Sequence, residues 1–243
     1  MQVAGIVEQS FTAWHGRASA VVYFAGSPYP KNCWHYPVLE RYPLAVRHSS
    51  NDLEKALRAI EEQVDRKRIT AIVLGGAEPL LQQDLPEFCR ELKKLRLEVR
   101  LETFGSNPKL LRELLDAKLA DFVSLRVKSV FAKYKELFGS SGEPVKESYA
   151  LLASSGVTYE VCVTPVPEVV EEKELRLTVW NVQESPRLVI EQFDPSRCVE
   201  KQLKTARKPT VDELVKLASS LQFHGLVFVR AEGREAEVQR MAA

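Results

Sequence analysis

Four cysteines are the side chains of this sequence best suited to hold a soft metal or to act as nucleophiles. They are Cys33, Cys89, Cys162 and Cys198, and no two of them form a CxxC pair. Because their spacing also fits no small disulfide scaffold, we expect a reduced protein with a cytoplasmic location. A site that joins Cys33, His35 and Cys198 is conceivable, but the pattern does not favour it, and we predict no metal ligands.

A second group of candidate residues consists of a glycine pair and six polar residues that stand on or directly after apolar runs. The candidate ligand contacts are Gly75, Gly76, Glu78, Glu102, Ser124, Arg126, Lys128 and Asp194. Gly75 and Gly76 could equally form only a tight turn, and Glu78 could be a solvated or capping carboxylate.

The apolar runs alternate with stretches of helical period. Strands are expected at residues 20–25, 70–74, 97–103, 121–128, 157–163, 187–193 and 226–230. Helices are expected at residues 50–66, 84–95, 107–117, 131–138, 143–155, 168–179 and 210–221. Asn107, followed by Pro108, and Thr210 are helix N-cap signals.

Strands and helices that alternate at this spacing predict an α/β fold with a parallel sheet and crossover helices. The strand runs read as continuously apolar, which favours a sheet buried on both faces. Six or seven such units indicate a complete or partial barrel, with a doubly wound open sheet as the alternative. In both architectures ligands bind at the carboxyl ends of the strands. We expect one domain over residues 1–243, with a core at about 5–230 and a polar, frayed tail from Glu232.

The charge balance argues against two classes of partner. The chain has 34 basic and 33 acidic residues and a formal net charge of +1, so neither nucleic acid nor an anionic membrane is indicated. No apolar run is long enough to cross a membrane, and no signal peptide is recognisable. The charged fraction of 28% is also typical of thermophilic proteins.

Several motifs, in order along the chain, resemble those of the radical S-adenosylmethionine superfamily. The resemblance is closest to the activating proteins of anaerobic ribonucleoside-triphosphate reductase. The matching pieces are residues 5–10, 75–82 with Ala77 inserted, 102–108, 125–128, 133–139 and 192–196. The resemblance implies a partial TIM-type (β/α)6 barrel, bound S-adenosylmethionine, and a 4Fe–4S cluster held by three thiolates of the first loop.

The first loop departs from that pattern. With the loop length preserved, the three ligand positions fall on Ser27, Lys31 and Trp34, with Cys33 beside the third and His35 at the family's histidine. None of the three is a thiolate, and lysine and tryptophan do not ligate iron.

The cofactor pocket that the resemblance implies is altered too. Arg126 stands where the family has an aspartate, and Asp194 stands where it has an arginine. Tyr29, Trp34 and Tyr36 could form a partner surface or a hydrophobic plug in place of the cluster.

We therefore expect a degenerate member of this fold that lacks the cluster ligands and has no catalytic residues, acting as a binding or scaffold subunit for a protein partner. No cofactor is expected: the 4Fe–4S cluster is judged absent, although S-adenosylmethionine is conceivable. Two alternatives stay open. One is an activating enzyme of the reductase type with unusual cluster ligands, and the other is a cluster-free binder of S-adenosylmethionine or a nucleotide.

Overall fold

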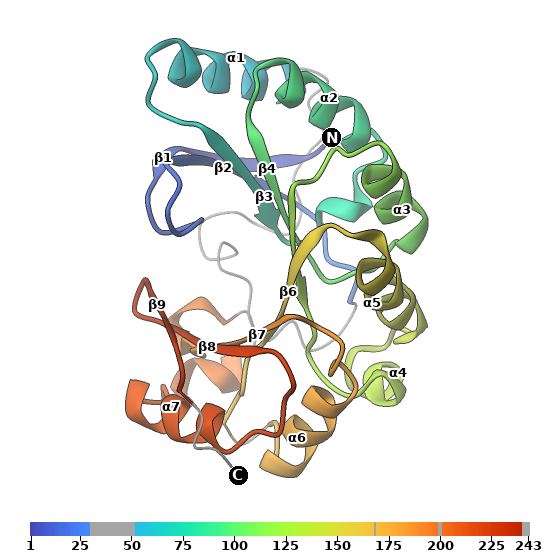
Figure 1. The fold of residues 1–243 in the computed structure, drawn as a ribbon, viewed down its shortest axis with the longest axis vertical. Coiled ribbons are helices and arrows are strands. Elements are labelled where there is room, and N and C mark those ends of the chain that lie inside the picture. The colour runs from blue at the N-terminus through green and yellow to red at the C-terminus, as the bar shows by residue number, and fades with distance from the viewer. Residues whose placement is uncertain (30–51, 168, 199–200, 240–243) are drawn as a thin grey trace.

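The fold is built on one curved sheet with helices on its outer side (Figure 1). A computed structural model describes residues 1–29, 52–167, 169–198 and 201–239. Within these ranges, nine strands pair in the order β1-β2-β3-β4-β5-β6-β7-β8-β9. Their bounds are β1 Val3–Ser10, β2 Ser19–Phe24, β3 Ala71–Gly76, β4 Glu98–Thr103, β5 Phe122–Arg126, β6 Thr158–Val163, β7 Arg187–Glu191, β8 Leu226–Ala231 and β9 Arg234–Glu237.

The strand order identifies the architecture. Strands β2 to β8 pair in parallel, each with the next in sequence. A doubly wound sheet would reverse its order at a switch point, and this one does not. The predicted α/β partial barrel is therefore confirmed, and the doubly wound alternative is excluded.

Helices connect the parallel strands and cover the outer face of the sheet. Their bounds are α1 Asp52–Asp65, α2 Leu85–Lys94, α3 Pro108–Asp116, α4 Tyr134–Phe138, α5 Glu143–Ser155, α6 Glu172–Trp180 and α7 Val211–Ser219. Short 3-10 turns occur at Pro79–Leu81, Phe131–Lys133, Pro195–Arg197 and Lys201–Thr205. No helix in these described ranges is long and apolar enough to cross a membrane.

Local capping signals place two helices as expected. The Asn107 side chain accepts a hydrogen bond from the backbone N–H of Leu110, and Pro108 occupies the first turn of α3. Thr210 and Glu213 form a reciprocal capping box at the start of α7. Both signals act within four residues, so tertiary packing does not override them.

The apolar core lies between the outer face of the strands and the helices. On β5, Val123 and Leu125 are fully buried in this core, whereas Ser124 and Arg126 alternate with them and point into the barrel. Phe24 of β2 packs edge-on against Phe88 of α2, with ring centroids 6.3 Å apart. The expectation of a sheet buried on both faces is confirmed, because nearly all residues of β2, β3 and β6 are buried. The strands are not continuously apolar, however, since Arg100, Ser124 and Arg126 bring charged and polar groups to the inner face.

Two edge strands differ from the expected elements. β1 pairs antiparallel with β2 at one edge, and β9 pairs antiparallel with β8 at the other. The tail expected to fray from Glu232 instead forms this second hairpin, and Val238 behind it is buried. Hydrogen bonding to β8 stabilises a segment whose own sequence, Arg-Glu-Ala-Glu, has no apolar run.

Candidate functional site

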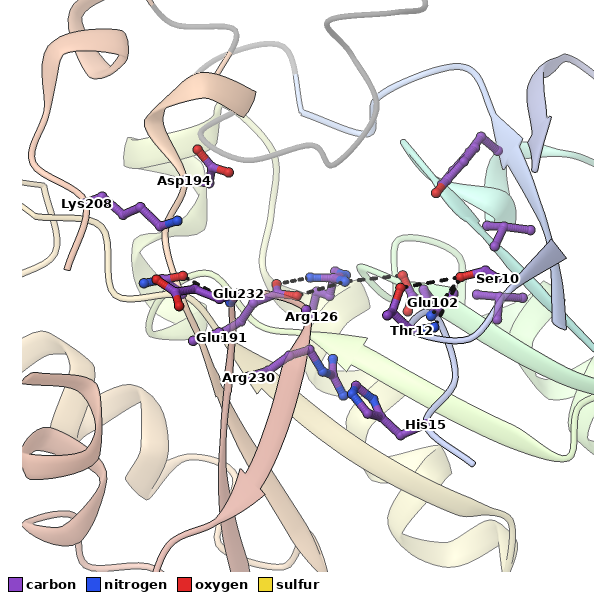
Figure 2. Close-up of a pocket in the computed structure, with 17 residues that line it drawn as sticks. Ser10, Thr12, His15, Glu102, Arg126, Glu191, Asp194, Lys208, Arg230 and Glu232 are labelled. Carbon is purple, nitrogen blue, oxygen red and sulfur yellow. Dashed lines mark hydrogen bonds and ion pairs between the residues drawn. The ribbon is translucent and has the colours of Figure 1, made fainter. Parts of the chain in front are cut away.

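A cavity of about 560 Å³ lies inside the barrel, toward the carboxyl ends of several parallel strands (Figure 2). Strands β2, β3, β4, β5, β7 and β8 contribute Val21, Tyr23, Val73, Glu102, Arg126, Glu191 and Arg230 to its wall. The end of β1 and the loop that follows it, the turn between β8 and β9, the segment after β7, and Lys208 complete the lining. This is the position at which α/β barrels bind their ligands.

One arginine holds two carboxylates in the wall of the cavity. Arg126 Nη2 lies 3.2 Å from Glu102 Oε2, and the same guanidinium donates hydrogen bonds to Glu191 (Figure 2). Burial alone would lower the pKa of Arg126, but Glu191 and Glu102 outweigh it and raise that pKa. Arg126 therefore stays charged and fixes both carboxylates in place.

A second charged group lies beneath the first and centres on Glu160, which is fully buried. Glu160 Oε1 accepts hydrogen bonds from Arg100 at 2.7 Å, from Ser124 at 2.8 Å and from Arg230 at 2.8 Å. Glu160 Oε2 accepts one from Arg187 at 3.0 Å. These bonds satisfy a carboxylate that would otherwise be very costly to bury.

The environment of Glu160 keeps it ionised. Burial alone would raise the pKa of Glu160, but Arg100 and Arg230 outweigh it and lower the pKa to about 2. Nearby Cys162 has its pKa raised, chiefly by burial, and its Sγ accepts a contact of 3.6 Å from Arg230 Nη1. Cys162 is therefore a neutral thiol within the charged interior.

The glycine pair lies at the end of β3, where a side chain would be crowded at Gly75 and excluded at Gly76. A Cβ on Gly75 would lie 3.3 Å from Glu102 Oε2. A Cβ on Gly76, whose φ is +96°, would lie 2.8 Å from the backbone nitrogen and oxygen of Phe24. Both glycines thus allow β2, β3 and β4 to come together beside the cavity.

Glu78 is fully buried and does not line the cavity. Its carboxylate accepts hydrogen bonds from Thr103 Oγ1 at 2.6 Å, Phe104 N at 2.8 Å and Leu80 N at 3.0 Å. Burial raises the pKa of Glu78, and these hydrogen bonds oppose that shift. Glu78 therefore caps the 3-10 turn that follows β3 and links it to the loop after β4. This agrees with the interpretation of Glu78 as a capping carboxylate.

The remaining candidate contacts divide between the cavity and its surroundings. Asp194 lines the cavity and accepts a hydrogen bond from the backbone N–H of Ser196 at 3.0 Å. Ser124 is fully buried below the cavity. Lys128 stands over the ring of Phe104, with Nζ 4.9 Å from the centroid. The structure therefore brings Glu102, Arg126 and Asp194 into one cavity, with Gly75 beside Glu102.

The first loop is described only at its start. Ser27 Oγ donates a hydrogen bond to the backbone oxygen of Tyr29 and accepts one from the backbone N–H of Tyr29, both at 3.1 Å. The Tyr29 ring is buried against Phe104 and Phe138. The predictions for Lys31, Cys33, Trp34, His35 and Tyr36 fall outside the described residues. Within the described ranges, no three His, Cys, Asp or Glu side chains form a group that could hold a metal ion.

Sequence reasoning missed Glu160, Glu191 and Arg230, although β4 and β7 carried a signal for a charged interior. In β4 the order Glu-Val-Arg-Leu-Glu-Thr alternates charged and apolar side chains, and β7 begins and ends on a charged residue. A period of two indicates one polar face on a strand. Counting that alternation would have predicted a charged barrel interior.

The cavity suits a small ligand that carries both signs of charge. Its volume lies within the range of about 300–1,000 Å³ that is typical of ligand sites. Its lining includes the carboxylates of Glu102 and Asp194 and the ammonium of Lys208. S-Adenosylmethionine has a sulfonium, an ammonium and a carboxylate, so these residues fit its charges. They are hard oxygen and nitrogen donors, and they do not fit an iron–sulfur cluster, which needs soft ligands.

Comparisons with known proteins agree on one superfamily. The family described as the radical SAM superfamily matches residues 33–175. A proposed glycyl-radical enzyme activating enzyme of Methanocaldococcus jannaschii is 30% identical over 222 residues, covering 88% of this chain and 89% of the relative.

Solved structures share the fold at low sequence identity. TYW1 with a lysine-pyruvate adduct has a TM-score of 0.61 at 12% identity, covering 96% of this chain and 84% of TYW1. SuiB of Streptococcus suis bound to S-adenosylmethionine has a TM-score of 0.58 at 11% identity, covering 84% of this chain and 51% of SuiB. The methyltransferase TsrM of Kitasatospora setae, with cobalamin and a [4Fe-4S] cluster bound, has a TM-score of 0.51 at 13% identity, covering 71% of this chain and 36% of TsrM. The chain thus spans about half the length of SuiB.

These findings contradict the prediction that the chain has no cofactor and no 4Fe–4S cluster. The family match and the Methanocaldococcus jannaschii relative point to a cluster cofactor instead. The prediction depended on counting residues through the first loop with no gap, which placed Ser27, Lys31 and Trp34 at the ligand positions. The family match begins at Cys33, inside that loop, so the ungapped count does not outweigh the family match.

Proposed function

Because the chain belongs to the radical SAM superfamily, we propose that it is an activating enzyme that installs a glycyl radical on a partner protein. The observation that carries the proposal is the charged cavity at the carboxyl ends of the barrel strands, in a chain that matches an activating-enzyme relative over nearly its whole length. Its substrates would be S-adenosylmethionine and a glycine residue of the partner.

The cavity residues would bind and orient S-adenosylmethionine. Glu102, held by Arg126, and Asp194 would accept hydrogen bonds from its ammonium and ribose hydroxyl groups, and Lys208 would face its carboxylate. A 4Fe–4S cluster, when bound, supplies the electron that splits S-adenosylmethionine. The described residues hold no group of three His, Cys, Asp or Glu side chains that could bind a metal, and residues 30–51 contain one thiol, Cys33, and the imidazoles of His35 and His48. We propose Cys33 as a cluster ligand, although the sequence does not supply the three first-loop thiolates of the family pattern.

The scaffold interpretation that we favoured from the sequence has less support than this enzymatic one. It depended on the loss of the cluster ligands, which the family match does not support. The third interpretation, a cluster-free binder of S-adenosylmethionine, uses the same cavity residues. An assay of cluster assembly and turnover separates all three.

The test is anaerobic reconstitution of the full chain with iron and sulfide, followed by iron analysis. Dithionite and S-adenosylmethionine are then added, and 5′-deoxyadenosine is measured. We expect about four irons per chain and formation of 5′-deoxyadenosine. Cys33→Ala should lose iron, whereas Cys89→Ala, which removes a buried thiol of α2, should retain it.

Each result decides between the interpretations. Iron at background level, with no binding of S-adenosylmethionine, would leave the scaffold interpretation. Binding of S-adenosylmethionine without iron would support the cluster-free binder. Equal loss of iron in both cysteine variants would show that destabilisation, and not ligation, explains the effect of Cys33→Ala.

A further inference from the structure

Helix α6 has large apolar side chains on its outward side as well as on its buried side. Leu175 and Val179 are buried in the core. Leu177 and Trp180 lie one turn apart on the other side, with exposed fractions of 46% and 63%. A surface helix normally has polar residues opposite its buried face. Packing within the described part of the chain therefore does not account for Leu177 and Trp180.

These two side chains border a second cavity, of about 250 Å³, which we call the α6 groove. Leu221, from the segment that follows α7, supplies a further apolar wall. Trp180 ends α6 before β7, and Leu221 precedes β8, so the groove lies at the amino ends of these strands. The barrel cavity lies toward their carboxyl ends, and no residue lines both. The α6 groove is therefore a separate site on the outer surface.

The walls of the α6 groove are held together by side-chain hydrogen bonds. Arg176 Nη1 donates to the backbone oxygen of Ser220 at 2.8 Å. Gln183 Nε2 donates to the backbone oxygen of Gln222 at 2.7 Å, and Gln183 Oε1 accepts a hydrogen bond from the backbone N–H of His224 at 3.1 Å. These bonds fix the segment after α7 against α6. The groove is therefore preformed, and a ligand would not have to order it on binding.

The charge of the α6 groove favours an acidic partner. Its charged lining residues are Lys173 and Arg176, and among the described residues no Asp or Glu lines it. Glu172 pairs with Arg176 at 2.6 Å, which leaves the ammonium of Lys173 as the net charge of this set. Two copies of the chain that met groove to groove would bring like charges together. The groove therefore suits a carboxylate of another protein better than a second copy.

We propose that the α6 groove binds an acidic amphipathic helix of a partner protein. An apolar side chain of that helix inserts between Leu177 and Trp180, and a carboxylate beside it faces Lys173. Helices that lay an apolar face into a groove are a common mode of recognition, and tryptophan is a frequent anchor at such interfaces. The inference goes beyond the proposed reaction, because a groove outside the barrel holds its partner whether or not the barrel cavity is occupied.

The test uses a model helix as the probe, with the full chain and no cofactor. The acidic probe is a fluorescein-labelled peptide of alanine, leucine and glutamate in which leucine recurs every third or fourth residue. A basic probe has lysine in place of each glutamate. Binding is followed by fluorescence anisotropy. Trp180→Ala removes the anchor, and Phe11→Ala is the matched control, because Phe11 is an equally exposed aromatic residue, at 67%, that does not line the groove.

We expect the acidic probe to bind, with affinity reduced about tenfold or more by Trp180→Ala and less than about twofold by Phe11→Ala. Lys173→Glu should weaken the acidic probe and strengthen the basic one, and it serves if Trp180→Ala fails to fold, since Lys173 is exposed.

Three results would overturn the proposal. They are no binding of the acidic probe at about 1 mM, equal affinities for Trp180→Ala and Phe11→Ala, and a dimer in analytical ultracentrifugation that Trp180→Ala abolishes. The last result would assign the groove to a second copy of the chain. Because no cluster, S-adenosylmethionine or glycine substrate is present, failure here is distinct from failure of the proposed reaction.

Discussion

Glu160 is the side chain on which the charged interior of the barrel converges. Its carboxylate accepts hydrogen bonds from three arginines and a serine while fully buried. Glu160→Gln replaces the carboxylate that Arg100, Arg187 and Arg230 share with a neutral amide, although Glu102 and Glu235 still pair with these arginines. We expect a loss of about 3 kcal/mol of unfolding free energy. Glu98→Gln, which removes a half-exposed partner of Arg17, should cost much less. Urea unfolding of both variants checks the difference, and equal losses would contradict it.

The same residue predicts a dependence of stability on pH. The pKa of Glu160 is about 2 in the folded protein and about 4.3 in an unfolded chain. Because the folded pKa is depressed, the stabilisation is fully present above the unfolded value and is lost as pH falls toward 2. It amounts to about 3 kcal/mol. Unfolding free energies measured between pH 6 and pH 3 should fall more steeply for the natural protein than for Glu160→Gln, and parallel curves would refute this role.

At the scale of single residues, part of the cavity lining could be predicted from the sequence. Glu102, Arg126 and Asp194 line the cavity because the rule that ligands gather at the carboxyl ends of parallel strands depends only on strand order. It did not find Glu160 or Arg230, because these side chains contact each other only once the sheet curls and brings β6 and β8 to the same interior.

Gly76 allows β3 to lie close to β2 because glycine has no side chain. Gly76→Ala would push a methyl group against the backbone of Phe24 at 2.8 Å, at a φ of +96°. We expect it to cost more than about 2 kcal/mol. Gly156→Ala also has a positive φ but meets nothing within 4 Å, so about 1 kcal/mol is expected. Thermal unfolding of the pair isolates the steric contribution, and a similar cost for both would mean that β2 and β3 can move apart.

Helix α7 offers a test of capping. The hydroxyl of Thr210 accepts a hydrogen bond from the backbone N–H of Glu213 at 3.2 Å. Thr210→Ala removes it and should lower the unfolding free energy by about 1 kcal/mol, whereas Thr210→Ser should restore most of that loss. If Thr210→Ser is as unstable as Thr210→Ala, the methyl group and not the cap is responsible.

Elements with local signals were predictable, and elements made by pairing were not. The start of α3 at Pro108 follows from Asn107 alone. β1 and β9 have no comparable signal. Five of the eight residues of β1 are short or polar (Ala, Gly, Glu, Gln and Ser), and β9 is Arg-Glu-Ala-Glu. Each exists because a neighbouring strand supplies its hydrogen bonds.

At the scale of the whole molecule, the sheet should be least stable at its two edges. β1 and β9 each pair with one neighbour, whereas β3 to β7 lie between two. Hydrogen exchange should therefore reach β9 and β1 first and the central strands last. Native-state exchange read by mass spectrometry checks the order. Protection of β9 equal to that of β5 would indicate that another contact secures this edge.

The open sheet also has a mechanical consequence. A closed barrel is a complete ring, and widening it requires hydrogen bonds to break somewhere along the circumference. This barrel is a split ring, because its ladder stops at β1 and β9. A split ring widens by a slight untwisting shared among all its strands, and no single pairing has to be given up. The diameter of the interior can therefore adjust to its contents at a cost spread over the whole sheet.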